Sequence, residues 1–126
     1  MDASEIMSKD VITISHDKNA YEAAKLMKEH DIGALPVVSA GTLIGIVTES
    51  DIFKEVTARN MLPEKVAIDS IMSTDLVIVS PDTKIHDING LLVKHDIRRV
   101  IVIENGQIAG IISASDLIRQ AYHWTK

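Results

Sequence analysis

The chain has 126 residues, and its 13 lysine and arginine residues against 18 aspartate and glutamate residues give a net charge of −5. This acidic balance argues against nucleic acid as a partner, because nucleic-acid-binding proteins present a basic face. The sequence contains no apolar run long enough for a membrane span and no cysteine for disulfides or thiolate zinc sites. With 46% hydrophobic residues, the chain is expected to be a folded cytoplasmic protein that binds neither nucleic acid nor a membrane.

Hydrophobic periodicity and turn residues predict the same order of elements in both halves of the chain. The first half is predicted to contain strand, helix, strand, strand and helix, at residues 11–14, 19–30, 35–38, 43–47 and about 50–60. The second half is predicted to repeat this order, at residues 76–79, 84–95, 100–103, 108–112 and 115–123. Gly33 is the predicted stop of the first helix. Hairpin turns are predicted at Ala40-Gly41-Thr42 and at Asn105-Gly106. Residues 61–70 are left as a short connector.

The two halves are copies of one unit. Residues 6–53 align with residues 71–118 without a gap, and 16 of these 48 paired positions are identical. A copy of about sixty residues buries too little surface to be more than marginally stable by itself, so we expect the copies to stabilise each other. The prediction is an α+β fold with α/β-type packing. It is made of two pseudo-symmetric repeats, residues 1–62 and 63–126, that pack through their sheets.

The motifs inside each copy resemble those of the cystathionine beta-synthase (CBS) domain. They are the strand Leu35-Pro36-Val37-Val38 and the closing segments 45–51 (Gly-Ile-Val-Thr-Glu-Ser-Asp) and 110–116 (Gly-Ile-Ile-Ser-Ala-Ser-Asp). Two copies in tandem resemble a CBS pair, also called a Bateman module. The resemblance implies a regulatory module that binds AMP, ADP, ATP or S-adenosylmethionine in clefts between the copies. It also implies an unidentified protein that the module regulates.

The closing segments carry the main candidate site residues, which are Thr48, Ser50 and Asp51 in the first copy and Ser113, Ser115 and Asp116 in the second. A hydroxyl followed three residues later by a carboxylate is a capping box, in which each side chain bonds a backbone N–H at the start of a helix. The resemblance adds a second interpretation, in which the carboxylate accepts the two hydroxyls of a ribose and the hydroxyl lies near ribose and phosphate. A helix N-terminus is also a favourable place for phosphate. The two interpretations are compatible, and the sequence leaves both open.

The copies differ just before the central strand, where Arg98-Arg99 of the second copy corresponds to Gly33-Ala34 of the first. Two arginines at a strand edge are often solvated charges, but the resemblance places this segment in the cleft, where arginine binds phosphate through its planar fork. Further lining residues implied by the resemblance are Ile32, Ile97 and the adenine-contacting Ile12 and Val77, for which simple core packing is an equal alternative. The cleft with the arginines, closed by Ile32, Gly33 and Ala34, is expected to be the better nucleotide site.

The leading hypothesis is a stand-alone sensor that requires no cofactor, takes an adenine nucleotide as its regulatory ligand and forms a homodimer. The alternative is a ligand-independent scaffold for oligomerisation or protein interaction. An enzyme is disfavoured because no nucleophile with a paired base and no phosphate-binding loop motif occurs. A metal site is also disfavoured, because His16, His86 and His123 have no acidic or histidine partner at ligand spacing. The homodimer is expected to form through the apolar helices, extended by Met61, Leu62, Tyr122 and Trp124.

Overall fold

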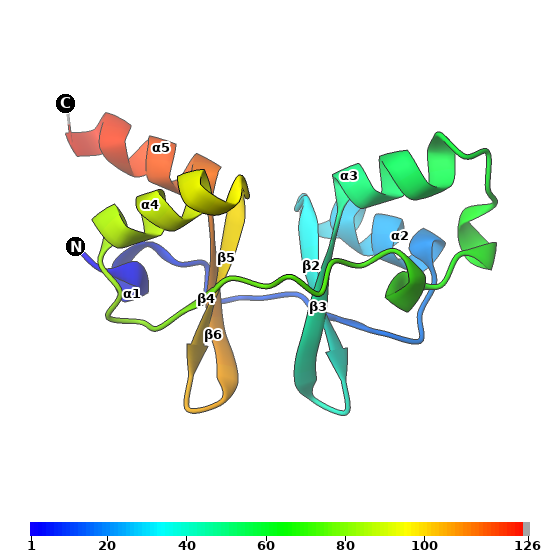
Figure 1. The fold of residues 1–126 in the computed structure, drawn as a ribbon, viewed down its shortest axis with the longest axis horizontal. Helices are drawn as coiled ribbons and strands as arrows, with labels where there is room; N and C mark the ends of the chain where they lie inside the picture. Colours follow the sequence, from blue (N-terminus) through cyan, green and yellow to red (C-terminus); the bar gives the residue numbers. More distant parts are fainter. Residues whose placement is uncertain (125–126) are drawn as a thin grey trace. The chain divides into compact units, whose positions relative to one another are not determined.

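The computed structural model describes residues 1–124, with side chains as far as Tyr122, and its elements follow the predicted order (Figure 1). The side chains of His123 and Trp124, named above, lie outside this described part. The chain divides into two compact units. Unit 1 consists of Met1–Val11 and Leu76–Lys126, and unit 2 of Ile12–Asp75. Each unit contains one three-stranded sheet and its helices, which confirms the α+β class.

Unit 2 contains a mixed sheet in the order β1-β2-β3, formed by Ile14–Ser15, Ala34–Ser39 and Thr42–Thr48. β1 runs parallel to β2, and β2 runs antiparallel to β3. Helix α2 (Ala20–His30) connects β1 to β2, as expected for a parallel crossover, and α3 (Glu49–Ile52) follows β3 directly. The central strand is buried at Leu35 and Val37, and these residues pack with Ala23 and Met27 of α2. Helix α2 therefore packs on the sheet through a shared hydrophobic core.

Unit 1 repeats this sheet with β4 (Ile78–Val79), β5 (Arg99–Glu104) and β6 (Gln107–Ser113) in the order β4-β5-β6. Its helices are α4 (Ile85–His95), α5 (Ala114–Trp124) and the short N-terminal α1 (Ala3–Ile6). The pairing register repeats as well, since each hairpin carries one irregularity at the same place, between Val37 and Val38 and between Val102 and Ile103. The repeat in the sequence is thus a repeat in backbone structure.

The compact units differ from the sequence copies in one respect, because the leading segment of each copy belongs to the unit built from the other copy's strands. In unit 2, Ser73 exchanges two backbone hydrogen bonds with Ile46 of β3, both of 2.9 Å, and Ile68 is fully buried in the core. In unit 1, Ser8 exchanges the matching bonds with Ile111 of β6, at 3.0 and 3.1 Å. Figure 1 shows this N-terminal segment, in blue, with α1 beside the second copy's elements. Each sheet is therefore completed by a segment from far away in the sequence.

A methionine of each leading segment packs against a glycine of the sheet. Met72 lies over Gly45 of β3, and an added Cβ at Gly45 would lie 2.6 Å from its sulfur. Met7 lies over Gly110 of β6 in the same way, at 2.6 Å from sulfur to the position of an added Cβ. The two glycines are required for this close approach, because a side chain there would meet atoms already in place.

Several predicted boundaries were wrong in ways that have physical reasons. The first strand was predicted over 11–14, but the residues that pair with β2 are Ile14 and Ser15. The pairing starts later than predicted because the chain up to Val11 belongs to unit 1. The helix predicted over 50–60 is α-helical as far as Ile52 and continues as a π-helix over Phe53–Thr57.

The helix before β2 ends with Asp31 in the left-handed conformation (φ 52°) rather than at Gly33. Aspartate tolerates that conformation, and Asp96 (φ 51°) ends α4 in the same way. The predicted connector 61–70 contains two short 3₁₀ turns, Pro63–Lys65 and Ile68–Ser70.

Candidate functional site

The end of β6 and the start of α5 form a strand–helix junction in unit 1. The Asp116 N–H donates to the Ser113 hydroxyl at 3.2 Å, and the Ser113 N–H donates to Asp116 Oδ2 at 2.8 Å. These two bonds complete a capping box, so the capping interpretation is confirmed for this pair. The Asp116 side chain is 17% exposed, and its carboxylate is therefore held in a fixed place near the protein surface. Ser115, in the same turn, is exposed.

The junction of β3 and α3 in unit 2 has the same geometry. The Asp51 N–H donates to the Thr48 hydroxyl at 3.2 Å, and the Thr48 N–H donates to Asp51 Oδ2 at 2.9 Å. Ser50 is exposed, like Ser115. The two closing motifs therefore build one structure twice, as their sequences predicted.

Sheet pairing brings the predicted arginines to the junction of unit 1. Arg99 is the register partner of Ser113, and the Ala114 N–H donates to the carbonyl of Arg98 at 2.8 Å. Arg98 is exposed and Arg99 is half-buried. The structure thus collects Arg98, Arg99, Ser113 and Asp116 at one edge of one unit. This edge combines two cationic side chains with a fixed carboxylate.

At the matching edge of unit 2 the backbone is the same and the charge is missing. Ala34 is the register partner of Thr48, and the Glu49 N–H donates to the carbonyl of Gly33 at 3.0 Å. Ala34 is buried. The edge therefore presents a carboxylate, Asp51, beside Gly33 and Ala34, which carry no cationic side chain.

The aliphatic candidates all contribute to the core of their own unit. Ile12 and Ile32 pack against the core of unit 2, and Val77 and Ile97 pack against the core of unit 1. All four are partly exposed, so each also presents some surface. Val77 accepts a backbone hydrogen bond from Ile101 at 3.2 Å, next to the two paired residues of β4. The core-packing interpretation therefore holds for these residues, and a contact with adenine stays a prediction.

Sequence analysis missed Arg119, which lies one turn into α5. Its Nη2 donates to Asp116 Oδ1 at 2.5 Å, so the second oxygen of this carboxylate is also engaged. The corresponding residue of unit 2 is Lys54, and among the interactions of the described residues none joins Lys54 to Asp51. The signal was a basic residue three positions after the aspartate in both copies, a spacing that places two side chains on one helix face.

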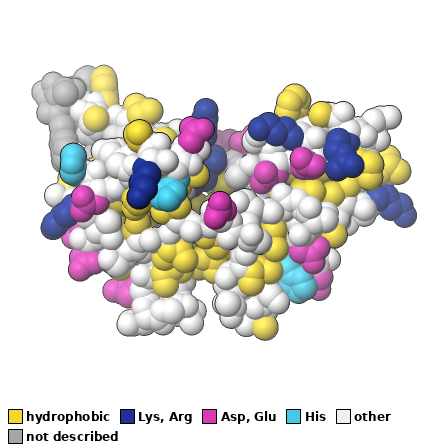
Figure 2. Space-filling model, in the orientation of Figure 1, with side chains coloured by type: hydrophobic (Ala, Val, Ile, Leu, Met, Phe, Trp, Pro, Cys, Tyr) yellow, Lys and Arg dark blue, Asp and Glu magenta, His cyan; other side chains and the backbone are white. Residues whose placement is uncertain are grey.

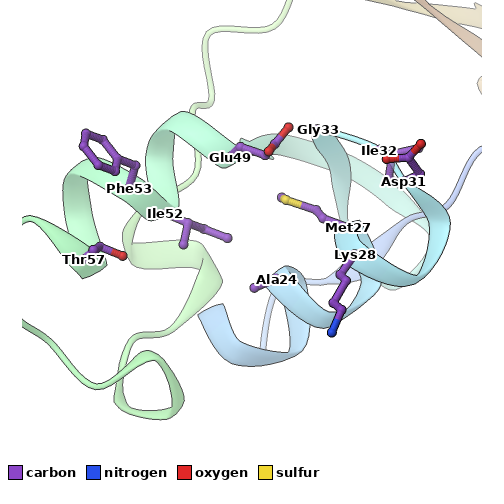
Figure 3. Close-up of a pocket in the computed structure, with 10 residues that line it drawn as sticks. All are labelled: Ala24, Met27, Lys28, Asp31, Ile32, Gly33, Glu49, Ile52, Phe53 and Thr57. Carbon is purple, nitrogen blue, oxygen red and sulfur yellow. The ribbon is translucent and has the colours of Figure 1, made fainter.

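Sequence analysis also missed a pocket of 440 Å³ on the helical side of unit 2, between α2 and α3 (Figure 3). Its lining combines apolar side chains with a charged rim, and comprises Ala24, Met27, Lys28, Asp31, Ile32, Gly33, Glu49, Ile52, Phe53 and Thr57. Ile32 and Gly33 are the predicted site residues that border it, whereas Thr48, Ser50 and Asp51 do not. The pocket therefore adjoins the strand–helix junction of the same unit at Gly33 and Glu49 but does not include its capping box.

Two further kinds of feature are absent from the described part of the chain. Residues 1–122 contain no group of three histidine or acidic side chains placed to hold a metal ion. They also contain no helix with the length and apolar character needed to cross a membrane.

Comparison with known proteins agrees with this architecture. The CBS domain family model matches residues 3–58 and again residues 68–123. CBS domain-containing protein YhcV of Bacillus subtilis is 36% identical over 111 residues, which is 88% of this chain and 79% of that protein. The chain belongs to the CBS domain family and contains two such domains, which confirms the tandem CBS pair.

Two solved structures share the fold over the whole chain. A CBS-domain protein from Burkholderia ambifaria superposes with a TM-score of 0.94 at 26% identity, over 100% of this chain and 97% of that one. The CBS domain pair of protein MJ0100 superposes with a TM-score of 0.88 at 30% identity, over 100% and 98% of the two chains. That pair was crystallised with 5′-methylthioadenosine and S-adenosyl-L-methionine.

Proposed function

We propose that this chain is a regulatory sensor that binds an adenosine-containing ligand, and that the junction of unit 1 is its main contact with ribose and phosphate. The observation that carries the proposal is the backbone pairing that places Arg98 and Arg99 beside the capping box of Ser113 and Asp116. A carboxylate can accept the hydroxyls of a ribose, and two arginines can bind phosphate oxygens through charge-assisted hydrogen bonds. The similar MJ0100 pair, which binds two adenosine compounds, supports the ligand class.

The fixed position of the carboxylate supports the same proposal. Asp116 is held by the Ser113 N–H at 2.8 Å, so ligand binding does not have to immobilise this side chain. A side chain that is already ordered saves the entropy cost of binding. The ligand would then shift the population of conformations and change the surface offered to a regulated protein. No catalytic step is included in the proposal.

A thermal-shift and calorimetric panel of AMP, ADP, ATP, S-adenosylmethionine and 5′-methylthioadenosine tests the proposal. A ligand at one hundred times its dissociation constant stabilises the native state by about 2.7 kcal/mol, which raises the melting midpoint by several degrees. GTP at the same concentration is the matched control for a triphosphate with a different base. A midpoint that none of the adenosine compounds moves would support the scaffold alternative. A midpoint that GTP and ATP raise equally would contradict the selectivity for adenosine.

We also propose that the chain forms a homodimer through its helices. On the adjoining helices α4 and α5 of unit 1, Val93 is 82% exposed and Ile118 is 69% exposed. Phe53, in the π-helix of unit 2, is 65% exposed. Apolar side chains interrupt the charged surface over the helices in Figure 2. Large exposed apolar side chains on helices are typical of interaction surfaces, and a second copy of the chain would cover those of each unit.

Light scattering tests the dimer, which should have twice the monomer mass of 13.8 kDa at micromolar concentration. Ile118→Asp should release monomers, because an aspartate would be buried in the interface without a partner. Ile78→Asp is the matched control, since Ile78 is also exposed but lies on β4 rather than on a helix. A wild-type protein that is monomeric under these conditions would contradict the proposal.

A further inference from the structure

Asp116 enters any binding event with both carboxylate oxygens occupied. Oδ2 accepts the Ser113 N–H at 2.8 Å, and Oδ1 accepts from Arg119 Nη2 at 2.5 Å. The two partners differ in mobility, because one is backbone in a capping box and the other is a side chain that is 67% exposed. The bond to Arg119 is therefore the one that an incoming group can replace.

The other unit provides an internal comparison. Asp51 accepts the Thr48 N–H at 2.9 Å through Oδ2, and no interaction among the described residues engages its Oδ1. The residue equivalent to Arg119 is Lys54, which is exposed. Lysine is a flexible point charge, whereas arginine offers a planar fork suited to carboxylate and phosphate oxygens. The duplicated junctions thus differ in whether the carboxylate is already paired.

We propose that Arg119 determines the specificity of the unit 1 junction by favouring anionic over neutral adenosine ligands. The inference rests on the proposed function, in which Asp116 accepts the ribose hydroxyls. Each carboxylate oxygen can accept a second hydrogen bond, so a ribose hydroxyl that binds Oδ1 competes with the exposed Arg119 side chain for that oxygen. A displaced guanidinium stays on α5, one helical turn after Asp116, and adds a third cation to the junction that carries Arg98 and Arg99. A ligand with phosphate gives the guanidinium a new anionic partner, whereas a neutral ligand breaks the ion pair and offers none.

The test is calorimetric titration of wild type and Arg119→Gln with adenosine, AMP and ATP. Glutamine keeps most of the side-chain length and removes the charge. Adenosine should bind about two- to fivefold more tightly to the variant, because it no longer competes with an exposed ion pair. ATP should bind roughly tenfold more weakly, because it loses a hydrogen bond to a charged group. AMP should show a smaller loss than ATP.

Two further variants separate this role from a structural one. Arg119→Lys should keep much of the ATP affinity because it keeps the charge. Lys54→Gln, the matched change in unit 2, should leave the tighter site unchanged. A merely structural role would move adenosine and ATP in the same direction, so the opposite signs are the diagnostic result.

The outcomes distinguish this inference from the proposed function. If wild type binds the ligands and Arg119→Gln shifts adenosine and ATP by the same factor, or shifts neither, the role of Arg119 is overturned. If wild type binds none of the three ligands, the proposed function itself fails, and the role of Arg119 fails with it.

Discussion

The two strand–helix junctions of this chain share a backbone and differ in chemistry. Both capping boxes have bonds of 2.8 to 3.2 Å. In both units the first N–H of the helix also donates to the carbonyl of the residue just before the central strand. Beside these equal frames, unit 1 carries Arg98, Arg99 and an ion-paired aspartate, whereas unit 2 carries Gly33 and Ala34. The repeat has therefore kept the residues that build the frame and has varied those that face outward. A duplicated backbone can therefore carry two edges of different charge.

The largest effect should come from where the chain is cut. Residues 12–75 contain all of unit 2, whereas residues 1–62 lack the buried Val66 and Ile68 and the bonds of Ser73 to β3. Full burial of one such side chain contributes about 1.5–3 kcal/mol, which a marginal sixty-residue unit cannot lose. Circular dichroism should show more structure and a sharper thermal transition for 12–75 than for 1–62. Fragments of nearly equal length that behave alike would contradict the exchange of leading segments.

The next largest effect compares the two aspartates in ligand binding. Asp116→Ala removes a hydrogen bond to a charged group, which contributes about 1.5–3 kcal/mol and corresponds to roughly ten- to hundredfold in affinity. Asp51→Ala should weaken the tightest binding event by less, because its junction has no arginines. Titration of both variants with AMP and ATP is the measurement. Each variant also loses its capping box, so their folded fractions must be shown to match by circular dichroism. Equal losses would argue against unit 1 as the main site.

Replacing Gly45 or Gly110 by alanine compares the two methionine contacts. A Cβ at Gly45 would lie 2.6 Å from the sulfur of Met72 and 2.9 Å from the backbone oxygen of Ser73. A Cβ at Gly110 would meet side-chain atoms of Met7, at 2.6, 2.7 and 2.9 Å. Each Gly→Ala change should destabilise the protein by about 1–3 kcal/mol in denaturant unfolding.

The second substitution in each pair sharpens this test. Met7→Gly should relieve the overlap caused by Gly110→Ala, because all three contacts there are side-chain atoms of Met7, including Cβ at 2.9 Å. Met72→Gly should only partly relieve Gly45→Ala, because the backbone oxygen of Ser73 stays in place. Equal rescue in both pairs would show that the backbone contact at Ser73 is unimportant.

A smaller effect concerns the hairpin turns. Ala40 and Asn105 occupy equivalent turn positions with φ of 49° and 53°, followed by Gly41 and Gly106 at 80° and 77°. Positive φ at both central residues matches a type I′ turn, which favours asparagine over alanine at its first position. Ala40→Asn should therefore stabilise the chain by about 1 kcal/mol, and Asn105→Ala should destabilise it by a similar amount. Thermal melts that shift in the same direction for both variants would contradict this explanation.

The smallest expected effect is a change in titration. The Ser4 hydroxyl donates to Asp2 at 2.6 Å and holds the pKa of that carboxyl below its usual range. A lowered pKa in the folded state contributes stability above the unfolded pKa, and the contribution disappears as the pH falls through the folded value. Ser4→Ala should therefore raise the pKa of Asp2 in an NMR titration. Asp17, whose pKa is lowered by Ser15 in unit 2, is the control and should not change.

What could be predicted from the sequence was the local and the repeated part of the structure. The capping boxes follow from residues three positions apart, and the place of Arg98 and Arg99 beside Ser113 follows from the hairpin register. These features depend on short-range spacing, which a sequence shows directly. The repeat then doubled the evidence for each element.

The features that could not be predicted depend on long-range packing. Residues 1–8 and 66–73 carry little periodicity, so nothing in them shows which sheet they complete. The π-helix at Phe53–Thr57 has the same apolar pattern as the regular helix α5, and the pocket beside it depends on how α2 and α3 approach each other. Arg119 was missed because an exposed basic residue on a helix is ordinarily solvated, and its bond to Asp116 becomes evident when side chains are placed.

The exchanged leading segments also determine the order in which the two units can fold during synthesis. Residues 1–11 leave the ribosome about a hundred residues before β6 (Gln107–Ser113), the strand that they complete. At roughly 5–20 residues per second, this segment waits for several seconds without its partner. Unit 2 has no such delay, because Ile12–Asp75 is continuous in the chain and can form as soon as it is exposed. Nascent-chain folding should therefore begin with Ile12–Asp75, and residues 1–11 should pair with β6 last.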